Sequence, residues 1–346
     1  MRIVPHKDFL IDFYSEEQKS TINSFIDELR NDAPFITCHT SGSTGSPKAI
    51  RISKEALVLS AKNTIGFFDL KPKYKASLCI SVDFIAGKMM LVRALIGGMH
   101  LEVYLANASI GDHLLPSDFI ALFPIQLQGI MNTRGGLAKL KQCRNILIGG
   151  AQISKELEKE LIKNKITVYQ SYGMTETVSH IALKKTGYLQ ETHYKAIEGV
   201  SFKTLDDCLI IHYPKMSTTV IKTNDLVELK DAHHFKWIGR NDFVINSGGY
   251  KISPEIIEDK IQTILSNEIL LTGINDSEFG EKVGLIIKGT KDSINIRKAD
   301  LKSILHPYEI PKMVTFISSF ERTSNGKLDR KKTASKIKKS AWQILL

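Results

Sequence analysis

Residues 39–48, HTSGSTGSPK, combine side-chain types that together can bind an anion. Their glycines let backbone N–H groups approach a ligand, their hydroxyls can donate hydrogen bonds, and Lys48 adds a positive charge. The apolar runs 35–38 and 49–52 predict a strand on either side. A polyphosphate is the natural ligand, although the common G-x-x-x-x-G-K-[ST] spacing is absent. A flexible serine- and glycine-rich surface loop explains the same composition equally well.

A second segment with chemical potential is QSYGMTE, residues 170–176. It comes directly after a predicted strand, at the end where open α/β sheets bind ligands. The ring of Tyr172 could stack on a base, Thr175 could bond a phosphate oxygen, and Glu176 could hold Mg²⁺. On its own, this pattern is more typical of an ordinary turn followed by a helix-start glutamate.

Three further segments carry polar groups at turns. Asp225 could accept hydrogen bonds from ribose hydroxyls and Arg240 could bridge ribose and phosphate, or the two could form a surface salt bridge. The pair Gly248–Gly249 permits a tight turn beside a ligand, or merely a hairpin. Lys327 stands on a predicted turn among many solvated lysines.

Length, cysteine usage and charge exclude several classes of protein. The 346 residues suffice for two domains, and 42% hydrophobic content allows a buried core. Four scattered cysteines without C-x-x-C spacing argue against a disulfide framework or a zinc site and indicate a reducing compartment. No signal peptide or membrane span is predicted, so we expect a cytoplasmic protein. Most of the net charge of +10 lies in residues 322–339, which predicts a basic tail rather than a basic face across the fold. Such a tail is usually solvated, but it could also attract an anionic substrate or a nucleic acid, a function for which the charge run is the only sign.

The predicted elements alternate between strands and helices up to about residue 200, which indicates an α/β fold with helix-covered sheets. Ser15 is expected to cap a helix ending near Arg30, and Ser53 a helix ending near Phe67. Short strands follow, and an α+β pattern begins near Asp242. We therefore expect a large N-terminal domain, 1–241, and a small, mobile α+β C-terminal domain, 242–346.

Taken together and in this order, the segments resemble the AMP-forming acyl-CoA synthetases and adenylation enzymes, over residues 36–332. The resemblance implies ATP contacts at Thr40, Ser41, Gly42, Ser43, Thr44, Gly45, Lys48, Gly150, Ala151, Tyr172, Gly173, Asp225 and Arg240. It implies catalytic roles for Lys327, Thr175 and Glu176, with Glu176 as the Mg²⁺ ligand. It also implies a thioester-forming turn at Ser247, Gly248 and Gly249, a hinge at Asp242, and acyl-group contacts at Gly149.

The reaction that this resemblance implies has two steps. A carboxylate attacks the α-phosphorus of ATP to give an acyl-adenylate and pyrophosphate, and the thiol of coenzyme A then displaces AMP. ATP, Mg²⁺, coenzyme A and a small carboxylic acid are the implied cofactor and substrates. The small domain is expected to rotate between the steps, because Lys327 and the Gly248–Gly249 turn serve different ones.

The sequence departs from the family pattern in two places. Thr223-Asn224-Asp225 replaces the usual Thr-Gly-Asp, which is a mild change because asparagine tolerates the same turn. Only 39 residues precede Thr40, where the family normally has on the order of a hundred more. Part of the N-terminal subdomain is therefore expected to be missing, so the resemblance implies nothing about the outer wall of the acyl pocket or the state of any homo-oligomer.

Residues 84–95, FIAGKMMLVRAL, bear on the identity of the acid. Arg93 stands in an otherwise apolar predicted helix, and a buried guanidinium needs an anionic partner. Composition alone favours an internal Asp or Glu. The segment resembles the acyl-pocket helix of the 2-succinylbenzoate–CoA ligases of menaquinone biosynthesis, which implies substrate contacts at Phe84, Gly87 and Arg93, with Arg93 facing the second carboxylate.

Two alternatives remain at this point. One is a CoA ligase for another aryl or fatty acid. The other, of a different class, is a non-catalytic nucleotide-binding member of the family, against which the presence of Lys48, Glu176 and Lys327 argues.

Overall fold

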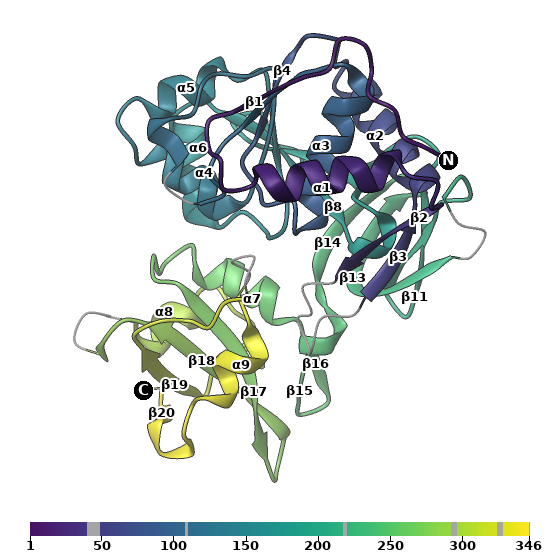
Figure 1. Ribbon diagram of the computed structural model, residues 1–346. Coiled ribbons are helices and arrows are strands. Elements are labelled where there is room, and N and C mark those ends of the chain that lie inside the picture. The colour runs from purple at the N-terminus through teal and green to yellow at the C-terminus, as the bar shows by residue number, and fades with distance from the viewer. Residues whose placement is uncertain (40–48, 108–109, 217–219, 292–295, 324–327, 346) are drawn as a thin grey trace. The chain divides into compact units, whose positions relative to one another are not determined.

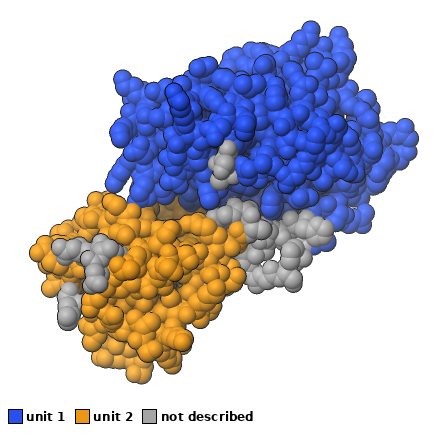
Figure 2. Space-filling model, turned by 60° about the vertical axis from the view of Figure 1, so that its left-hand side comes forward, with its two compact units in different colours: residues 1–201, 212–221, 231–234 blue, residues 202–211, 222–230, 235–346 orange. Residues whose placement is uncertain are grey.

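The computed structural model describes residues 1–39, 49–107, 110–216, 220–291, 296–323 and 328–345 (Figure 1). The chain forms two compact units (Figure 2). The first comprises residues 1–201, 212–221 and 231–234, and the second 202–211, 222–230 and 235–346. The predicted α/β class is confirmed, whereas the boundary at Asp242 between mobile domains stays a prediction.

Ten strands and six helices are described in the first unit. The strands are β1 (Leu10–Phe13), β2 (Phe35–His39), β3 (Ala49–Ser53), β4 (Lys75–Leu78), β5 (His100–Val103), β6 (Phe119–Leu122), β7 (Asn145–Ile148), β8 (Thr167–Gly173), β9 (His180–Gly187) and β10 (Tyr194–Ala196). The helices are α1 (Lys19–Arg30), α2 (Lys54–Phe67), α3 (Ile85–Gly97), α4 (Pro124–Met131), α5 (Gly136–Gln142) and α6 (Lys155–Lys163), with the short 3₁₀ turns η1 (Ile110–Asp112) and η2 (Thr175–Thr177).

The main sheet of this unit has the strand order β1-β5-β4-β6-β7-β8-β9-β10. The strands from β1 to β8 pair in parallel. The pairs β8–β9 and β9–β10 are antiparallel. Parallel strands place their carboxyl ends at one edge of the sheet, so the segments that follow β4, β6, β7 and β8 are brought together there.

Helices cover both faces of the parallel strands, as their apolar sequences require. On one face, Ile120 and Ile148 belong to a core cluster that also contains Leu127 of α4 and Leu161 of α6. On the other face, the ring of Phe119 lies 5.2 Å from that of Phe68, the residue that ends α2. Figure 1 shows α4, α5 and α6 on the opposite side of these strands from α2 and α3.

Local sequence signals explain where several helices begin and end. Ser53 caps α2, because its hydroxyl accepts the N–H of Ala56 at 3.1 Å. Pro124 opens α4, where a missing N–H costs nothing. Gly98 ends α3 in the left-handed conformation, with φ of +67°.

Two expectations about element bounds differ from the structure. The helix expected from Ser15 begins at Lys19, after Gln18, whose buried side chain instead bonds Val82 N and Tyr104 O. The strand expected up to Tyr169 continues through Gly173, because β9 pairs with it along its whole length. The segment 170–173 therefore lies within a strand rather than after one.

The strands predicted around residues 40–48 are confirmed. β2 and β3 pair antiparallel from Phe35–Ser53 to His39–Ala49. Lys54, fully buried at the start of α2, donates to the backbone carbonyl of Asn31 (2.7 Å) and to its side-chain oxygen (3.0 Å). These bonds tie the end of α1 to the base of the β2–β3 pair.

The second unit contains ten described strands, of 2 to 11 residues, and three described α-helices. The strands are β11 (Ser201–Leu205), β12 (Cys208–His212), β13 (Ile221–Asp231) and β14 (His234–Arg240), each lying mainly in this unit, and β15 (Ile245–Ser247), β16 (Tyr250–Ile252), β17 (Ile269–Asp276), β18 (Gly280–Lys288), β19 (Met313–Ile317) and β20 (Gln343–Ile344). The helices are α7 (Pro254–Ile261), α8 (Lys298–Lys302) and α9 (Arg330–Ser335), with 3₁₀ turns η3 (Asn241–Phe243) and η5 (Lys339–Ala341).

A sheet of order β16-β15-β18-β19-β20, with β17 also paired to β18, forms the centre of residues 245–345. Ile257 and Ile261 of α7 and Leu301 of α8 pack on it in one core cluster. The β18–β19 pair is parallel and the β17–β18 pair is antiparallel, which agrees with the predicted α+β pattern.

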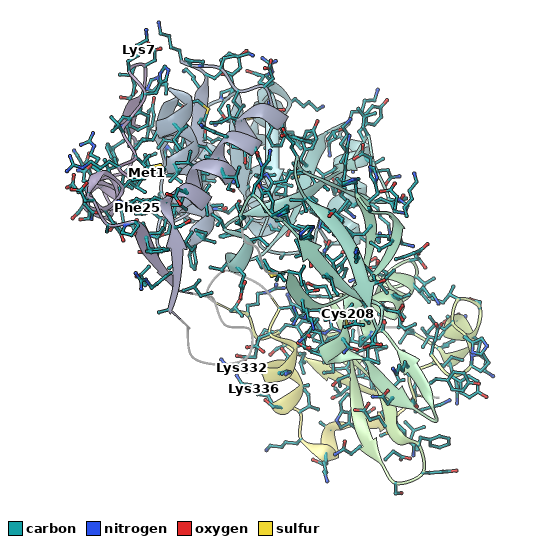
Figure 3. All side chains as sticks on the ribbon, turned by 90° about the vertical axis from the view of Figure 1, so that its right-hand side faces the viewer. Met1, Lys7, Phe25, Cys208, Lys332 and Lys336 are labelled. Carbon is teal, nitrogen blue, oxygen red and sulfur yellow. The ribbon has the colours of Figure 1, made fainter. Side chains whose placement is uncertain are left out.

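The described residues of the basic stretch, 322–323 and 328–339, are folded rather than a free tail. Lys332 and Lys336 project from α9 (Figure 3), and both pair with Glu321. Arg322 pairs with Glu268. Because these cations have acidic partners within the same unit, the stretch offers less uncompensated charge than its composition indicates.

Candidate active site

Three segments predicted to contact ligand meet at the carboxyl edge of the parallel sheet. The ring of Phe84, after β4, lies 6.3 Å from that of Phe123, after β6. Gly150, after β7, has φ of +83°, and a Cβ there would lie 2.6 Å from the Phe123 ring. β7 and β8 pair through Ile148 and Gln170, so Gly149–Ala151 lies beside the QSYGMTE segment. The structure thus joins the acyl and nucleotide segments that the sequence predicted separately.

The end of β8 is shaped by a register shift between Tyr172 and Gly173. The hydroxyl of Thr177 accepts the N–H of Met174 at 2.9 Å and lies 2.7 Å from the carbonyl of Ser179, which fixes the tight turn η2. Tyr172 is buried, with its ring 5.9 Å from that of Tyr194. Thr175 is half-buried at the start of η2, next to the exposed Glu176.

Glu176 has the properties that a magnesium ligand needs. Its carboxylate is exposed, and it forms no hydrogen bond or ion pair with the described residues. Carboxylate oxygens are hard ligands of the kind Mg²⁺ prefers. Among the described residues no cluster of three or more His, Cys, Asp or Glu could hold a metal by itself, so Glu176 would act together with substrate phosphates.

Arg93 is a buried cation of the first unit. Among the described residues, its hydrogen-bond partners are side-chain hydroxyls. It lies in α3 and is 1% exposed. Its Nε donates to the hydroxyl of Thr64 in α2 at 3.1 Å, and its Nη2 donates to the hydroxyl of Ser179 at 2.7 Å. Burial lowers the pKa of Arg93 to about 9, so the guanidinium is still charged at neutral pH.

The internal acid that composition favoured as a partner of Arg93 is not found. No Asp or Glu of the described residues forms an ion pair with it, and the remaining residues of this unit, 40–48, 108–109 and 217–219, include neither amino acid. Among the described residues, the hydrogen bonds of the buried guanidinium therefore go to neutral hydroxyls. Such a site is suited to an anionic group from outside the chain.

His180 completes this polar cluster. Its Nε2 lies 3.3 Å from the Thr64 hydroxyl and its Nδ1 3.5 Å from the Ser179 hydroxyl. Burial, with a smaller contribution from the charge of Arg93, lowers the pKa of His180 well below its ordinary value. The imidazole is neutral at pH 7, so it supplies hydrogen bonds without adding charge.

Gly87 positions the helix that carries Arg93. A Cβ at this position would lie 2.2 Å from the carbonyl oxygen of Ser81 and 2.7 Å from that of Ile80. Only glycine allows the first turn of α3 to approach the backbone this closely. The predicted substrate contact at Gly87 stays a prediction, but its packing role is clear.

In the second unit, Asp225, Arg240 and Asp242 form one group. Asp225 is buried and accepts the indole N–H of Trp237 at 3.2 Å. Arg240 lies 3.7 Å from the Asp225 carboxylate and donates to Asp242 at 2.6 Å. The salt bridge foreseen as the alternative to ribose contacts is thus present, and the ribose and hinge roles stay predictions.

The Ser247–Gly249 segment is a two-residue hairpin between β15 and β16. Ser247 pairs with Tyr250, and Gly248 and Gly249 have φ of +57° and +84°. Such a turn requires positive φ at both central positions, which glycine provides. Nothing lies within 4 Å of a Cβ built at Gly249, whereas one built at Gly248 would lie 3.3 Å from the ring of Phe279.

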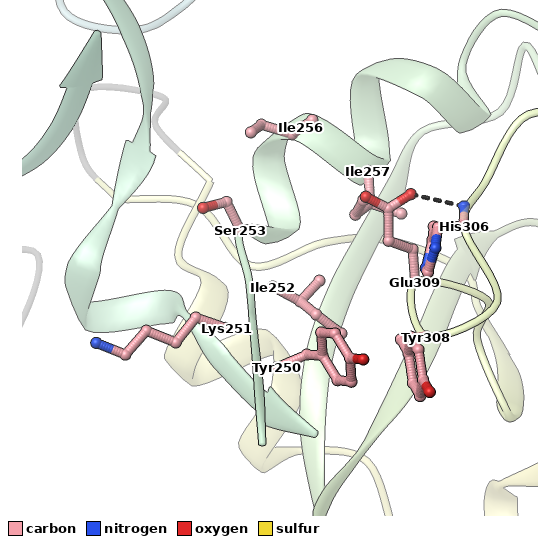
Figure 4. Close-up of a pocket in the computed structure, with 9 residues that line it drawn as sticks. All are labelled: Tyr250, Lys251, Ile252, Ser253, Ile256, Ile257, His306, Tyr308 and Glu309. Atoms are coloured by element: carbon pink, nitrogen blue, oxygen red, sulfur yellow. Dashed lines mark hydrogen bonds between the residues drawn. The ribbon is translucent and has the colours of Figure 1, made fainter. Parts of the chain in front are cut away.

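A pocket of about 190 Å³ opens directly after this hairpin (Figure 4). The rings of Tyr250 and Tyr308 stack at 3.8 Å, and Lys251 and Glu309 also line it. Glu309 accepts the backbone N–H of His306 at 2.9 Å and pairs with Lys260.

Two predicted parts of the site lie outside the described residues: the loop Thr40–Lys48 and Lys327. Their flanking residues are described. β2 and β3 pair up to His39 and Ala49, and Arg322 pairs antiparallel with Leu328. Both segments therefore leave from, and return to, paired backbone.

Sequence reasoning missed the side chains that surround Arg93. Thr64 and Ser179 are 29 and 86 residues away from it. Ser179 and His180 follow the QSYGMTE segment closely, which is a signal that could have included them. Thr64 gives no such signal, since a threonine within a helix is usually unremarked.

The fold and the site together define a nucleotide-binding enzyme of the α/β class. A family model described as AMP-binding enzyme matches residues 4–207, and the chain belongs to this family.

No helix of the described residues is long and apolar enough to cross a membrane.

Curated relatives narrow the comparison. The 2-succinylbenzoate–CoA ligase of Staphylococcus epidermidis is 28% identical over 329 residues, covering 86% of this chain and 68% of that protein. The ligase of the same name from Listeria innocua is 26% identical over 324 residues, covering 85% of this chain and 68% of that protein.

Solved structures show a similar fold. One is the acyl-CoA synthetase (AMP-forming)/AMP-acid ligase II-like protein from Dyadobacter fermentans, at 32% identity and a TM-score of 0.63, covering 93% of this chain and 95% of that one. Another is the O-succinylbenzoate coenzyme A synthetase from Bacillus subtilis in complex with ATP and magnesium, at 19% identity and a TM-score of 0.69, covering 94% and 79%. The latter likeness concerns the fold.

Proposed function

We propose that this chain is an ATP-dependent, AMP-forming acyl-CoA ligase, and that its acid is 2-succinylbenzoate. Membership of the AMP-binding family and the names of the curated relatives support the ligase class. The choice of acid rests on one observation, the buried Arg93 without an acidic partner in its unit. A cytoplasmic location belongs to the proposal, because all four cysteines are free, as in a reducing compartment.

The surroundings of Arg93 favour an acid with two carboxylates. One carboxylate must react, so it cannot also neutralise a buried guanidinium. The second would accept charge-assisted hydrogen bonds from Arg93, which the Thr64 and Ser179 hydroxyls hold in place through Nε and Nη2. 2-Succinylbenzoate has two carboxylates and an aromatic ring, and the rings of Phe84 and Phe123 offer apolar contacts beside α3.

In the first step, an oxygen of the reacting carboxylate attacks the α-phosphorus of ATP, and the bond to pyrophosphate breaks. The loop Thr40–Lys48 and Lys327 offset the charge on the phosphates. Tyr172, with Gly173, Gly150 and Ala151, holds the adenine, while Asp225 and Arg240 hold the ribose. Glu176 would hold Mg²⁺, which would supply positive charge beside the phosphates, and Thr175 would bond a phosphate oxygen.

In the second step, the sulfur of coenzyme A attacks the acyl carbon, and AMP leaves with the electrons of the broken acyl–oxygen bond. The Ser247–Gly249 hairpin borders the path of the thiol. Rotation about Asp242 exchanges Lys327 for this hairpin between the steps. Positioning supplies most of the catalysis, since neither step needs a covalent group from the chain.

The test is pyrophosphate release from ATP across a panel of acids, with and without coenzyme A. The panel contains 2-succinylbenzoate, benzoate, a monocarboxylic aryl acid of similar size and fatty acids. We expect release with 2-succinylbenzoate and thioester only when coenzyme A is present. Turnover of benzoates or fatty acids instead would identify the alternative ligase. ATP binding without pyrophosphate release for any acid would identify a non-catalytic nucleotide-binding protein.

A further inference from the structure

A chain of hydrogen bonds runs from β10 to the segment that follows β7. The hydroxyl of Tyr194 in β10 donates to Oε1 of Gln152 at 3.4 Å. Nε2 of Gln170 in β8 donates to the same oxygen. The hydroxyl of Thr186 in β9 donates to Oε1 of Gln170 at 3.4 Å. Three strands are thus linked to one side chain, Gln152, which comes directly after Ala151.

The donors of this chain are buried, and they use the full capacity of their acceptor. Tyr194, Gln170 and Thr186 are 1%, 2% and 3% exposed. Burial raises the pKa of Tyr194, so its hydroxyl keeps a proton to donate at neutral pH. An amide oxygen has two lone pairs, and the two donors occupy those of Gln152 Oε1. Because a buried donor without a partner is costly, the segment 149–152 is held at a fixed place beside β8 and β10.

The ring of Tyr194 contacts a second part of the site. Its centroid lies 5.9 Å from that of Tyr172, within the range of aromatic pairs. Nζ of Lys184 lies 5.0 Å from the centroid of the Tyr194 ring, a cation–π contact that also holds this ring in place. Tyr194 is therefore joined to the segment 149–152 through its hydroxyl and to Tyr172 through its ring.

We propose that Tyr194 is a positioning residue for the adenine of ATP, which acts through Gln152 on the segment 149–152 and through its ring on Tyr172. This role rests on the proposed function, which assigns the adenine contacts to Tyr172 and to residues of that segment. Two groups that must face one planar base need a fixed distance between them. Tyr194 touches both sides of that distance, from a strand that the predicted contacts do not include.

Tyr194→Phe tests the proposal because it removes the hydroxyl and keeps the ring. Binding of ATP and of AMP to the whole chain is measured by titration calorimetry, without any acid. We expect Kd to rise about 2–10-fold, the factor for the loss of one neutral hydrogen bond. The factor should be similar for both nucleotides, because they share the adenine and differ in their phosphates. In acid-dependent pyrophosphate exchange, KM for ATP should rise likewise, while kcat and KM for 2-succinylbenzoate stay within about twofold.

Tyr213→Phe is the matched control. Tyr213 is another buried tyrosine of the first unit, and its hydroxyl accepts a hydrogen bond from Nδ2 of Asn63 at 2.5 Å. Each variant loses one hydroxyl that bonds a side-chain amide, so both should lower the free energy of unfolding, but only Tyr194→Phe should weaken nucleotide binding. An unchanged Kd for ATP in Tyr194→Phe, or equal weakening in both variants, would overturn the positioning role. Weaker binding of ATP with unchanged binding of AMP would also overturn it, because the effect would then lie at the phosphates.

Gln152→Ala provides a second variant, in case Tyr194→Phe does not fold. It removes the oxygen that accepts both donors, so Kd for ATP and AMP should rise at least as far as in Tyr194→Phe. An unaltered Kd here would count against the link between β10 and the segment 149–152. If the wild-type chain binds neither nucleotide, the proposed function fails and this inference falls with it, whereas wild-type binding combined with unaffected variants refutes the positioning role alone.

Discussion

Arg93 in the first unit and Arg330 in the second are both buried guanidinium groups, but their partners differ. Arg330 donates two hydrogen bonds to the carboxylate of Glu258. Arg93 bonds two hydroxyls, and its unit offers it no described acid. The charge of Arg330 is thus paired with an acid of its own unit, whereas the charge of Arg93 has no described acid beside it, and the proposed function assigns that place to a carboxylate of the substrate.

The largest effect is expected for a third cation, Lys327, because it is predicted to act on the reacting groups themselves. Lys327→Ala should reduce acid-dependent pyrophosphate exchange by roughly 10²–10⁴-fold, as expected for one preorganised electrostatic group. Thioester formation from supplied acyl-adenylate should be retained. Loss of both half-reactions to the same extent would contradict the assignment of Lys327 to the first step alone.

Replacing each buried arginine by methionine separates the two by their effect on stability. Arg330→Met leaves Glu258 buried and unpaired, so the free energy of unfolding should fall by about 3–5 kcal/mol. Arg93→Met removes a charge that has no internal acid, so the loss should be much smaller. Urea unfolding of both variants measures the difference. A large loss for Arg93→Met would show that its charge is already compensated.

Replacing Arg93 should affect substrate kinetics much more than it affects stability. Arg93→Ala should lower kcat/KM for 2-succinylbenzoate by about 2–4 kcal/mol in transition-state free energy, the scale of a buried charge losing its partner. A monocarboxylic aryl acid of similar size should be much less affected, and ATP binding should hardly change. Steady-state kinetics with the two acids supplies the test, and an equal loss for both would place Arg93 away from the second carboxylate.

The hydroxyls that hold Arg93 should contribute less than the charge itself. Ser179→Ala removes the partner of Nη2, and hydrogen bonds to charged groups are worth about 1.5–3 kcal/mol. We expect kcat/KM for 2-succinylbenzoate to fall toward the lower end of this range. Ser171→Ala is a matched control, because that hydroxyl bonds a backbone carbonyl instead. Similar losses in both variants would argue against a specific role of Ser179.

The smallest effect concerns pH. The pKa of His180 is well below its usual value in the fold, whereas in the unfolded chain it is about 6.5. The unfolded state therefore binds the extra proton below that pH, and stability falls as the pH drops, by up to about 1.4 kcal/mol per pH unit. His180→Gln should flatten this dependence in unfolding experiments at pH 5 and 7.5. An unchanged slope would mean that His180 is protonated in the fold.

The sequence allowed much of the α/β framework to be predicted, because local signals act within a few residues. Ser53, Pro124 and Gly98 mark element ends by their own hydrogen bonding or backbone preference. The extension of β8 was missed because it depends on pairing with β9, a partner that local propensity does not reveal.

The partners of Arg93 could not be predicted either, because they too depend on contacts between segments that are distant in sequence. The sequence identified a cation in an apolar helix, and composition pointed to an acid. Which side chains face Arg93 depends on how α2 and the start of β9 pack against α3. The Arg330 pair likewise joins residues 72 positions apart.

Gly87 packs so closely against the backbone of Ile80 and Ser81 that it fixes the position of α3 along its own axis. At a rise of about 1.5 Å per residue, the six residues from Gly87 to Arg93 set these two levels about 9 Å apart along the helix axis. Because the helix cannot slide without a collision at Gly87, the depth of the guanidinium is constant. In the proposed function, the distance between the two carboxylates of the acid would therefore have to match this depth, and a preference for a longer or shorter acid would require a different side chain on α3 rather than a shift of the helix.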